Sequence, residues 1–390
     1  MKRLLIIGAS VLQVPAIVQA REMGLMVAVA DFNPHAAGVP QADRYYNVST
    51  IDEEGVYRAA KDFCADGIMT LATDMPMRAL AYACEKLNLL GLGYESAVKA
   101  TDKAEMIRAF EENGVAHPWY RVVKAGEKPA AEYTFPLVVK PVDSSGSRGV
   151  TLVRCPDELE AAIHYAAEKS RRGAVILEEY LRGPEVSVEI MVVAGAPHVL
   201  AITDKLTTGA PHFVEMGHAQ PSRLPQAQQE AICDLARRAA LAVGIENGTA
   251  HAEIILTEKG PKMVEIGARM GGDCITTHLT PLSTGIDMVG GAIRMALGEK
   301  PDLTRTLHKA AAIRYFDVPS GVIRAIEGVE NARKLPGVRE ITFVKQVGDI
   351  VGEIGSSGDR AGFVIAQADT AEAAVAICEQ AMAIIKIITE

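Results

Sequence analysis

Two glutamates and an arginine stand close together in the second half of the chain, and they could bind a cation and an anion. Glu253 and Glu265 each lie in an alternating apolar stretch, and residues 257–260 between the stretches are typical of a turn. This pattern predicts a β-hairpin. If both carboxylates point to one face, they can share a hard cation such as Mg²⁺, which prefers oxygen ligands. Arg269 adds a fixed cation that can stabilise charge on a phosphoryl or tetrahedral centre. An exposed hairpin with solvated glutamates fits these residues equally well.

A loop rich in serine and glycine could bind phosphate. Residues 142–149, Val-Asp-Ser-Ser-Gly-Ser-Arg-Gly, separate two predicted strands and offer free backbone N–H groups to phosphate oxygens. Lys140 ends the first of these strands, where it can reach the same phosphates. Lys103 stands in the first turn of a predicted helix, where a cation opposes the helix dipole, so an anionic partner is expected. The alternatives are a hairpin loop without ligand and a solvated lysine.

The elements that position these residues begin with a parallel sheet. The first 30 residues follow a strand–helix–strand pattern, which is typical of a doubly wound fold. Their glycines do not form G-x-G-x-x-G, which argues against nicotinamide binding. Residues 1–95 are predicted to form this domain, with another strand at 90–93. Asp31 and Asp74 are expected at the carboxyl edge of the sheet, where ligands usually bind.

Later segments are expected to provide the edges of a pocket and an α+β tail. Residues 212–218 and 273–278 mix polar and apolar side chains in a way that is typical of pocket edges. From residue 309 the pattern turns to short strands, and the chain is predicted to end with a helix over 370–387.

Length and composition place the chain among ordinary globular proteins. Its 390 residues suggest two or three domains, at roughly 150 residues per domain. A net charge of −9 argues against nucleic-acid binding. The six cysteines form no Cys-x-x-Cys pair, which suits a reducing compartment and speaks against zinc or a disulfide framework. The first apolar run ends at Gly8, too short for a signal peptide, and no run approaches a membrane span. We therefore predict a soluble, cytoplasmic protein without a membrane partner.

The order of these features along the chain resembles the ATP-grasp superfamily, and the resemblance spans essentially the whole sequence. The segment 178–185, Glu-x-x-Leu-x-Gly-Pro-Glu, is similar to the hinge of the D-alanine–D-alanine ligases. The resemblance implies that Glu178 and the backbone of Tyr180 and Leu181 hold adenine and that Glu185 holds the ribose. The full set of residues it assigns to ATP is Lys103, Lys140, Ser145, Gly146, Ser147, Gly149, Glu178, Tyr180, Leu181 and Glu185.

The same resemblance assigns the metal and the catalytic groups. It implies that Glu253 and Glu265 bind magnesium, as two ions of Mg²⁺ or alternatively Mn²⁺, and that Arg269 and Lys140 act at the reacting groups. Gly267 stands where many of these enzymes have an asparagine ligand, so water or phosphate would fill that place. The run Glu-Ile-Gly-Ala-Arg, with the following Gly-Gly-Asp, looks most like the branch of L-amino-acid ligases and carbamoyl-phosphate-synthetase-like ligases.

The implied fold is α/β, with three parts: a Rossmann-like domain over 1–95, an ATP-grasp domain over 96–300 with a lid at about 120–182, and an α+β subdomain over 301–390. The implied reaction joins a carboxylate to an amine through an acyl phosphate, with an amino acid or peptide as substrate and a homodimer as the assembly. Bicarbonate activation and a nucleotide-binding module without turnover are the alternatives. The expected substrate contacts are Asp74, His218, Asp273 and His278.

Overall fold

The N-terminal part is a parallel sheet between helices. The computed structural model describes residues 1–390 except 125–132, 145 and 147. The sheet has the order β3-β2-β1-β4. Its strands are β1 (Arg3–Ile7), β2 (Met26–Asp31), β3 (Arg44–Asn47) and β4 (Gly67–Met69). The helices of this part are α1 (Val14–Glu22), α2 (Glu53–Phe63), α3 (Met77–Leu87), α4 (Tyr94–Thr101) and α5 (Lys103–Glu112), with a 3-10 turn, η1 (Val39–Gln41).

The prediction of a strand at residues 90–93 is wrong. These residues form a bend that leads into α4, and Leu92 is buried without pairing to the sheet. Leu92 stands between two glycines, which favour turns over strands. The apolar residues of this segment therefore suggested a strand, although Leu92 is buried in a turn.

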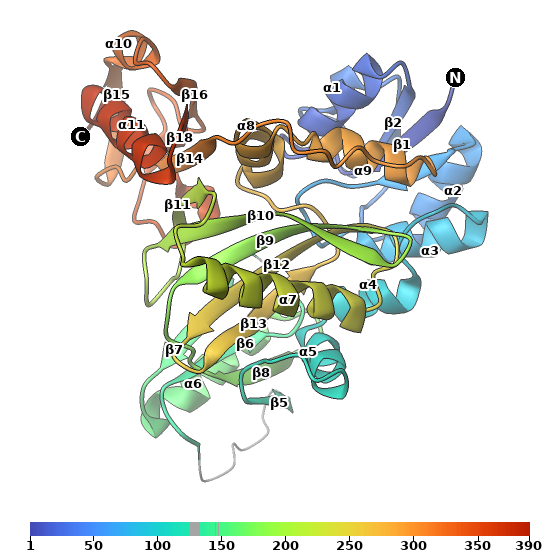
Figure 1. Ribbon diagram of the computed structural model, residues 1–390, viewed down its shortest axis with the longest axis horizontal. Helices are drawn as coiled ribbons and strands as arrows, with labels where there is room; N and C mark the ends of the chain where they lie inside the picture. Colours follow the sequence, from blue (N-terminus) through green and yellow to red (C-terminus); the bar gives the residue numbers. More distant parts are fainter. Residues whose placement is uncertain (125–132, 145, 147) are drawn as a thin grey trace.

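A large antiparallel sheet forms the centre of the molecule (Figure 1). Eight strands pair in the order β13-β12-β9-β10-β11-β14-β18-β16, and α7 (Gln226–Ala242) packs against strands of the first half. The strands are β9 (Glu185–Val193), β10 (Ala196–Thr207), β11 (Glu215–Gln220), β12 (Gly248–Thr257), β13 (Gly260–Gly267), β14 (Ala310–Tyr315), β16 (Val338–Phe343) and β18 (Gly362–Ala368). Between β13 and β14 lie a π-helical turn, η2 (Ile275–Leu279), then α8 (Thr280–Thr284) and α9 (Met288–Ala296).

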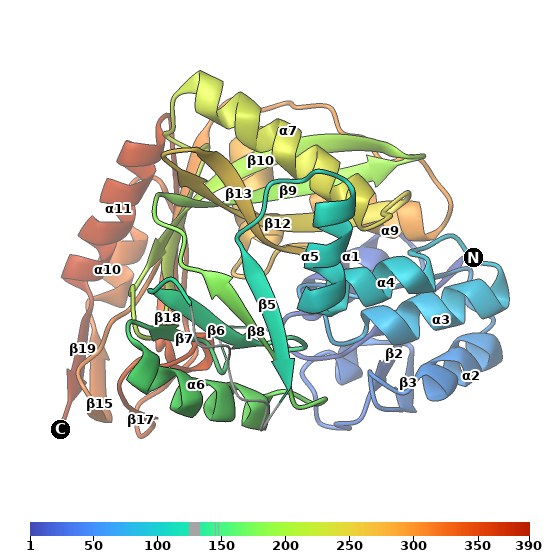
Figure 2. The ribbon, with the colours of Figure 1, turned by 90° about the horizontal axis from the view of Figure 1, so that it is seen from below.

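A smaller sheet with one helix lies beneath the central sheet. Its order is β5-β8-β6-β7, and all pairs are antiparallel. Figure 2 shows its helix α6 (Pro156–Lys169) between the C-terminal region and the N-terminal sheet. The strands are β5 (Tyr120–Lys124), β6 (Leu137–Pro141), β7 (Thr151–Val153) and β8 (Ala174–Glu179). This unit covers residues for which a lid was predicted, and the lid remains a prediction.

The C-terminal region shares the central sheet instead of standing apart from it. Its strands β14, β16 and β18 extend that sheet, while β17 (Ile350–Val351), β15 (Gly321–Glu327) and β19 (Lys386–Thr389) form a separate three-stranded sheet. Two helices, α10 (Val329–Arg333) and α11 (Ala371–Ile384), and the 3-10 turn η3 (Ser357–Asp359) complete it. The final helix therefore ends earlier than expected, because the last residues pair with β15. Their β-branched side chains favour a strand.

Two general features bear on function. No helix in the described part of the chain is long and apolar enough to cross a membrane. The fold is α/β with a parallel and several antiparallel sheets, as predicted.

Candidate active site

A cavity of about 630 Å³ lies where the N-terminal sheet, the small sheet, the central sheet and the C-terminal turn η3 meet. Its size is in the range of small-molecule sites, roughly 300–1,000 Å³. It is lined by most of the residues predicted from the sequence: Asp74, Lys103, Lys140, Gly146, Glu178, Tyr180, Leu181, Glu185, His218, Glu253, Glu265, Arg269 and Asp273. Residues scattered over 200 positions are thus brought to one site.

The fold leaves other predicted residues elsewhere. His278 lies 2.9 Å from Glu340 in an ion pair and is not among the residues that line this cavity. Gly149 does not line it either; its φ of +79° suits glycine, and a Cβ at this position would clash with Pro141 and Lys169. Asp31, expected at a ligand edge, accepts backbone N–H bonds from Ala9 and Asn33. Ser145 and Ser147 lie outside the described residues.

The two hairpin glutamates face the cavity together. Glu253 and Glu265 are direct cross-strand partners on β12 and β13, and such partners project to the same face. The Lys205 ammonium lies 3.1 Å from Glu253, and the Lys103 ammonium lies 2.9 Å from Glu265. Burial raises the pKa of Glu253, but Lys205 and His251 hold it well below its usual range. Glu253 is therefore anionic at neutral pH.

These carboxylates suit a magnesium ion that also binds phosphate. Among the described residues there is no group of three or more His, Cys, Asp or Glu side chains arranged to hold a metal. Mg²⁺ is commonly bound by only one or two carboxylates, with substrate phosphates and water as the other ligands. Glu253 and Glu265 fit that donor set, and Gly267 offers no side-chain ligand. Two ions remain a prediction.

The predicted nucleotide contacts come from the small sheet and the start of the central sheet. The Lys140 ammonium lies 2.7 Å from Glu178, and both side chains are buried. Beyond them, the rings of Tyr180 and Phe213 lie 6.3 Å apart at the cavity wall. Flat apolar groups and paired charges around one cavity can accept a base and a polyphosphate.

Arg269 is held by the N-terminal domain. Its Nε and Nη2 donate to the two carboxylate oxygens of Asp74 at 2.9 and 3.0 Å. This bidentate geometry fixes the guanidinium plane. Asp74 therefore orients the predicted catalytic arginine, while its carboxylate also lines the cavity.

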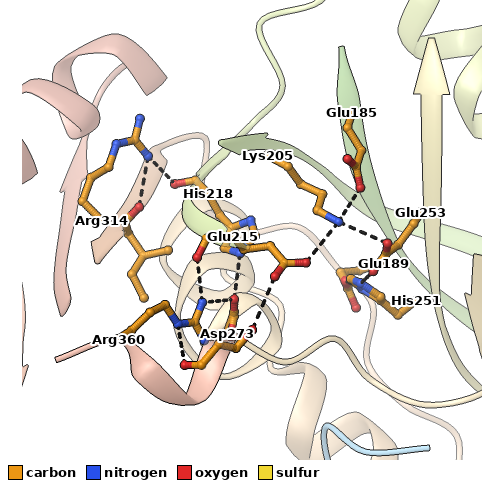
Figure 3. A network of polar contacts seen from close by, with 12 residues as sticks. Glu185, Glu189, Lys205, Glu215, His218, His251, Glu253, Asp273, Arg314 and Arg360 are labelled. Carbon is orange, nitrogen blue, oxygen red and sulfur yellow. Dashed lines mark hydrogen bonds and ion pairs between the residues drawn. The ribbon is translucent and has the colours of Figure 1, made fainter. Parts of the chain in front are cut away.

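Lys205 is the most important residue that sequence reasoning missed. Its side chain is only 3% exposed, and its ammonium lies 2.6 Å from Glu185, 3.1 Å from Glu253 and 3.5 Å from Glu215 (Figure 3). Although burial lowers it, these three carboxylates raise the pKa of Lys205 well above its usual value. The one feature of the sequence that could have indicated this role is the position of Lys205 within the mostly apolar strand β10.

Glu253 contacts a buried histidine, His251, which in turn contacts the buried Glu189. The carboxylate of Glu189, which is fully buried, contacts Nδ1 of His251 and accepts the Gly271 N–H at 3.2 Å. The other ring nitrogen of His251 lies 3.5 Å from Glu253. Burial lowers the pKa of His251, but Glu189 and Glu253 raise it to about 9. The imidazolium thus links a buried carboxylate to the predicted metal ligand.

The C-terminal region lines the cavity with residues 356–358, and its Arg360 contacts the cavity residue Asp273. Its guanidinium donates to both carboxylate oxygens of Asp273 at 2.7 Å and lies over the Tyr315 ring at 3.7 Å. Asp273 also contacts Nε2 of His218 at 3.2 Å. Asp273 and Cys274 have φ values of 51° and 60°, a strained conformation for non-glycine residues. Arg360 therefore holds the loop that follows Arg269.

Replacing Arg360 with methionine should destabilise the protein by about 3 kcal/mol at neutral pH, because it leaves a mostly buried Asp273 without its partner. Burial raises the pKa of Asp273, but Arg360 and His218 hold it below its usual value of 3.8. The stability from this lowered pKa is present above pH 3.8 and is lost as the pH falls through the native pKa. The difference between variant and wild type should therefore shrink in acid. Urea denaturation at several pH values measures it.

The matched control is Arg324→Met, which removes an exposed ion pair with Glu390. It should change the free energy of unfolding by less than about 1 kcal/mol. Equal losses in both variants would contradict the role assigned to Arg360.

Comparison with known proteins identifies two domains in this chain. Residues 133–277 match the ATP-grasp domain, and residues 314–390 match the L-amino acid ligase C-terminal domain 2. The alanine–anticapsin ligase of Bacillus subtilis is 30% identical over 245 residues, which cover 56% of this chain and 51% of the ligase. This chain thus spans about half the length of that relative.

Solved structures extend the similarity to the whole chain. An L-amino acid ligase from Bacillus licheniformis superposes with a TM-score of 0.86 at 25% identity, covering 100% of this chain and 99% of the other. A phosphoribosylglycinamide synthetase from Anaerococcus prevotii shares the fold with a TM-score of 0.82 at 24% identity, and the match covers 100% of both chains.

The domain matches identify an ATP-grasp domain in this chain, and the fold of the solved neighbours agrees with that assignment. The chain carries an ATP-grasp domain and the L-amino acid ligase C-terminal domain 2, and it is similar to ligases that include the alanine–anticapsin ligase and an L-amino acid ligase. The predicted family is confirmed. Enzymes of this superfamily use ATP and a divalent metal ion.

Proposed function

We propose that this protein joins the carboxylate of an amino acid or small peptide to the amine of a second amino acid, with conversion of ATP to ADP and phosphate. The observation that carries the proposal is the single cavity in which Glu253, Glu265, Lys103, Lys140 and Arg269 meet. The matches to L-amino acid ligases support an amino acid as substrate.

The first step is phosphoryl transfer. A carboxylate oxygen attacks the γ-phosphorus of ATP, and the bond to the bridging oxygen of ADP breaks. Catalysis of such transfers depends mainly on positioning and charge neutralisation. Lys103 and Lys140 would hold phosphate oxygens, and Arg269, oriented by Asp74, would face the reacting carboxylate. A magnesium ion on Glu253 and Glu265 would neutralise phosphate charge when bound.

The second step is aminolysis of the acyl phosphate. The amine nitrogen attacks the carbonyl carbon, the carbon–oxygen bond to phosphate breaks, and the nitrogen passes a proton to the departing phosphate. Arg269 is suited to stabilise the oxyanion of the tetrahedral centre. No nucleophilic side chain is required, and none of the described cysteines lines the cavity.

The experiment measures ADP and phosphate release with ATP and Mg²⁺ across single and paired amino acids, with bicarbonate as a separate arm. We expect release only when two amino acids are present, together with a dipeptide detected by mass spectrometry. Release with bicarbonate alone would instead indicate carboxyphosphate formation. Nucleotide binding without release in any arm would favour a module without turnover.

A further inference from the structure

A second, smaller cavity opens beside the active site and is rich in arginine. Its volume is about 170 Å³, and it lies between the start of α3, the end of α4, the start of α5 and the loop after α6. Four of its lining residues, Asp74, Lys103, Ser144 and Glu265, also line the main cavity. The two cavities therefore share a wall in which Lys103 was predicted to bind ATP, Glu265 to bind metal and Asp74 to contact substrate.

The carboxylates of this side cavity already have partners. Glu265 lies 2.9 Å from Lys103, and Asp74 receives two hydrogen bonds from Arg269. Asp143 accepts hydrogen bonds from the Ser170 hydroxyl and from the backbone N–H groups of residues 171 and 172. Of the lining cations, Arg172 lies 2.6 Å from Asp102.

Two guanidinium groups remain without a carboxylate. Among the described residues, no carboxylate oxygen lies within 4.0 Å of Arg78 or Arg171. Arg78 uses its Nε to donate to Thr101 Oγ1 at 2.8 Å, and Arg171 contacts the Met75 sulfur. Arg78 comes from α3 of the N-terminal domain, whereas Arg171 comes from the loop after α6 in the small sheet's unit. Two domains thus each contribute an arginine whose terminal N–H groups suit a planar oxyanion.

We propose that Arg78 and Arg171 bind the α-carboxylate of the amino acid that supplies the attacking amine. The inference rests on the proposed ligase function and names one substrate of the same site. The ammonium group of such an amino acid would lie toward Asp74, on the shared wall, where a carboxylate attracts it. The amine is then next to Arg269, beside the predicted acyl group. A zwitterion matches this arrangement of charges better than a simple amine does.

Inorganic phosphate has the same oxyanion chemistry, so the test has to separate the two ligands. It compares wild type with Arg78→Gln, Arg171→Gln and the conservative Arg78→Lys. The exposed Arg58→Gln, whose residue pairs with Glu54 on α2, is the control. Thermal melts and circular dichroism verify that each variant is folded.

The kinetic arm uses the amine substrate found by ADP release and its amide, which lacks the carboxylate. Loss of a charge-assisted contact should raise the KM for the amino acid roughly 10- to 100-fold in the glutamine variants. The kcat and the KM for ATP should change little, because the contact is equal in ground and transition states. Arg78→Lys should be intermediate. Wild type should discriminate against the amide, and Arg78→Gln should not.

The binding arm needs no turnover. Saturation-transfer NMR with a mixture of the twenty proteinogenic amino acids should show signals with wild type that Arg78→Gln and Arg171→Gln lose. If the variants lose those signals and no assay shows ADP release, the proposed ligase reaction is contradicted, but the proposed carboxylate site is supported. The proposal is overturned if no amino acid binds or if both variants behave as the control. It is also overturned if the amide binds as tightly as the amino acid and inorganic phosphate competes with both. That result would mean that the arginines bind phosphate instead of the carboxylate.

Discussion

Replacing Glu265 with glutamine should reduce ADP formation about 100- to 1,000-fold, the scale of losses seen when a group that stabilises transition-state charge is removed. Glu265 and Glu253 are cross-strand partners, and together they offer the oxygen donors for a metal ion beside the predicted phosphates. The substitution keeps the side-chain size but removes one of the two negative charges. The measurement is coupled-enzyme detection of ADP with the amino acids that support turnover.

The same hairpin offers a matched control. Glu258, in the exposed turn between β12 and β13, can also be changed to glutamine, and activity should stay within about twofold of wild type because no described partner depends on it. Thermal melts should show that Glu265→Gln remains folded, since Lys103 keeps its hydrogen bond to the Ser144 carbonyl. Activity of Glu265→Gln within tenfold of wild type would exclude this pair as the metal site.

Replacing Lys205 with methionine should have a large effect on stability as well as on activity. The substitution leaves Glu185, Glu215 and Glu253 facing one another without the buried ammonium between them. Removal of one partner from a buried ion pair typically costs about 3–5 kcal/mol. ATP binding should also weaken, because Glu185 and Glu253 lose the cation that fixes both. Urea denaturation and nucleotide titration measure the two effects.

The stability lost in Lys205→Met should depend on pH, and the pKa of Glu253 determines the direction of that dependence. Lys205 lowers the pKa of Glu253 in the native state below its usual value of 4.5. A lowered native pKa contributes stability above pH 4.5, and that stability is lost as the pH falls through the native pKa. The difference between Lys205→Met and wild type should therefore be largest at neutral pH and narrow below about pH 4.5.

The control for Lys205 is Lys2→Met, which removes an exposed ion pair with Glu299. It should change stability by less than about 1 kcal/mol at every pH. A pH-independent loss in Lys205→Met would mean that packing of its aliphatic stem, rather than its charge, explains the effect.

Much of the fold could be read from the sequence because it depends on local patterns. The alternating stretches around Glu253 and Glu265 and the turn between them define a hairpin whatever surrounds it. The turn near Lys140 and the segment 178–185 are likewise determined by neighbouring residues in the sequence. These features were sufficient to identify the superfamily, which the domain matches confirm.

The tertiary structure decided which charges meet. Lys205 and Arg360 lie in strand and loop patterns that say nothing about distant partners, yet they contact carboxylates up to 87 positions away. His278, in a segment that was typical of a pocket edge, pairs with Glu340 instead. The physical reason is that electrostatic partnership depends on distance in space and on burial, which sheet order and domain packing set. The sequence therefore determined the kinds of groups at the site, and the packing of four sheets determined their pairing.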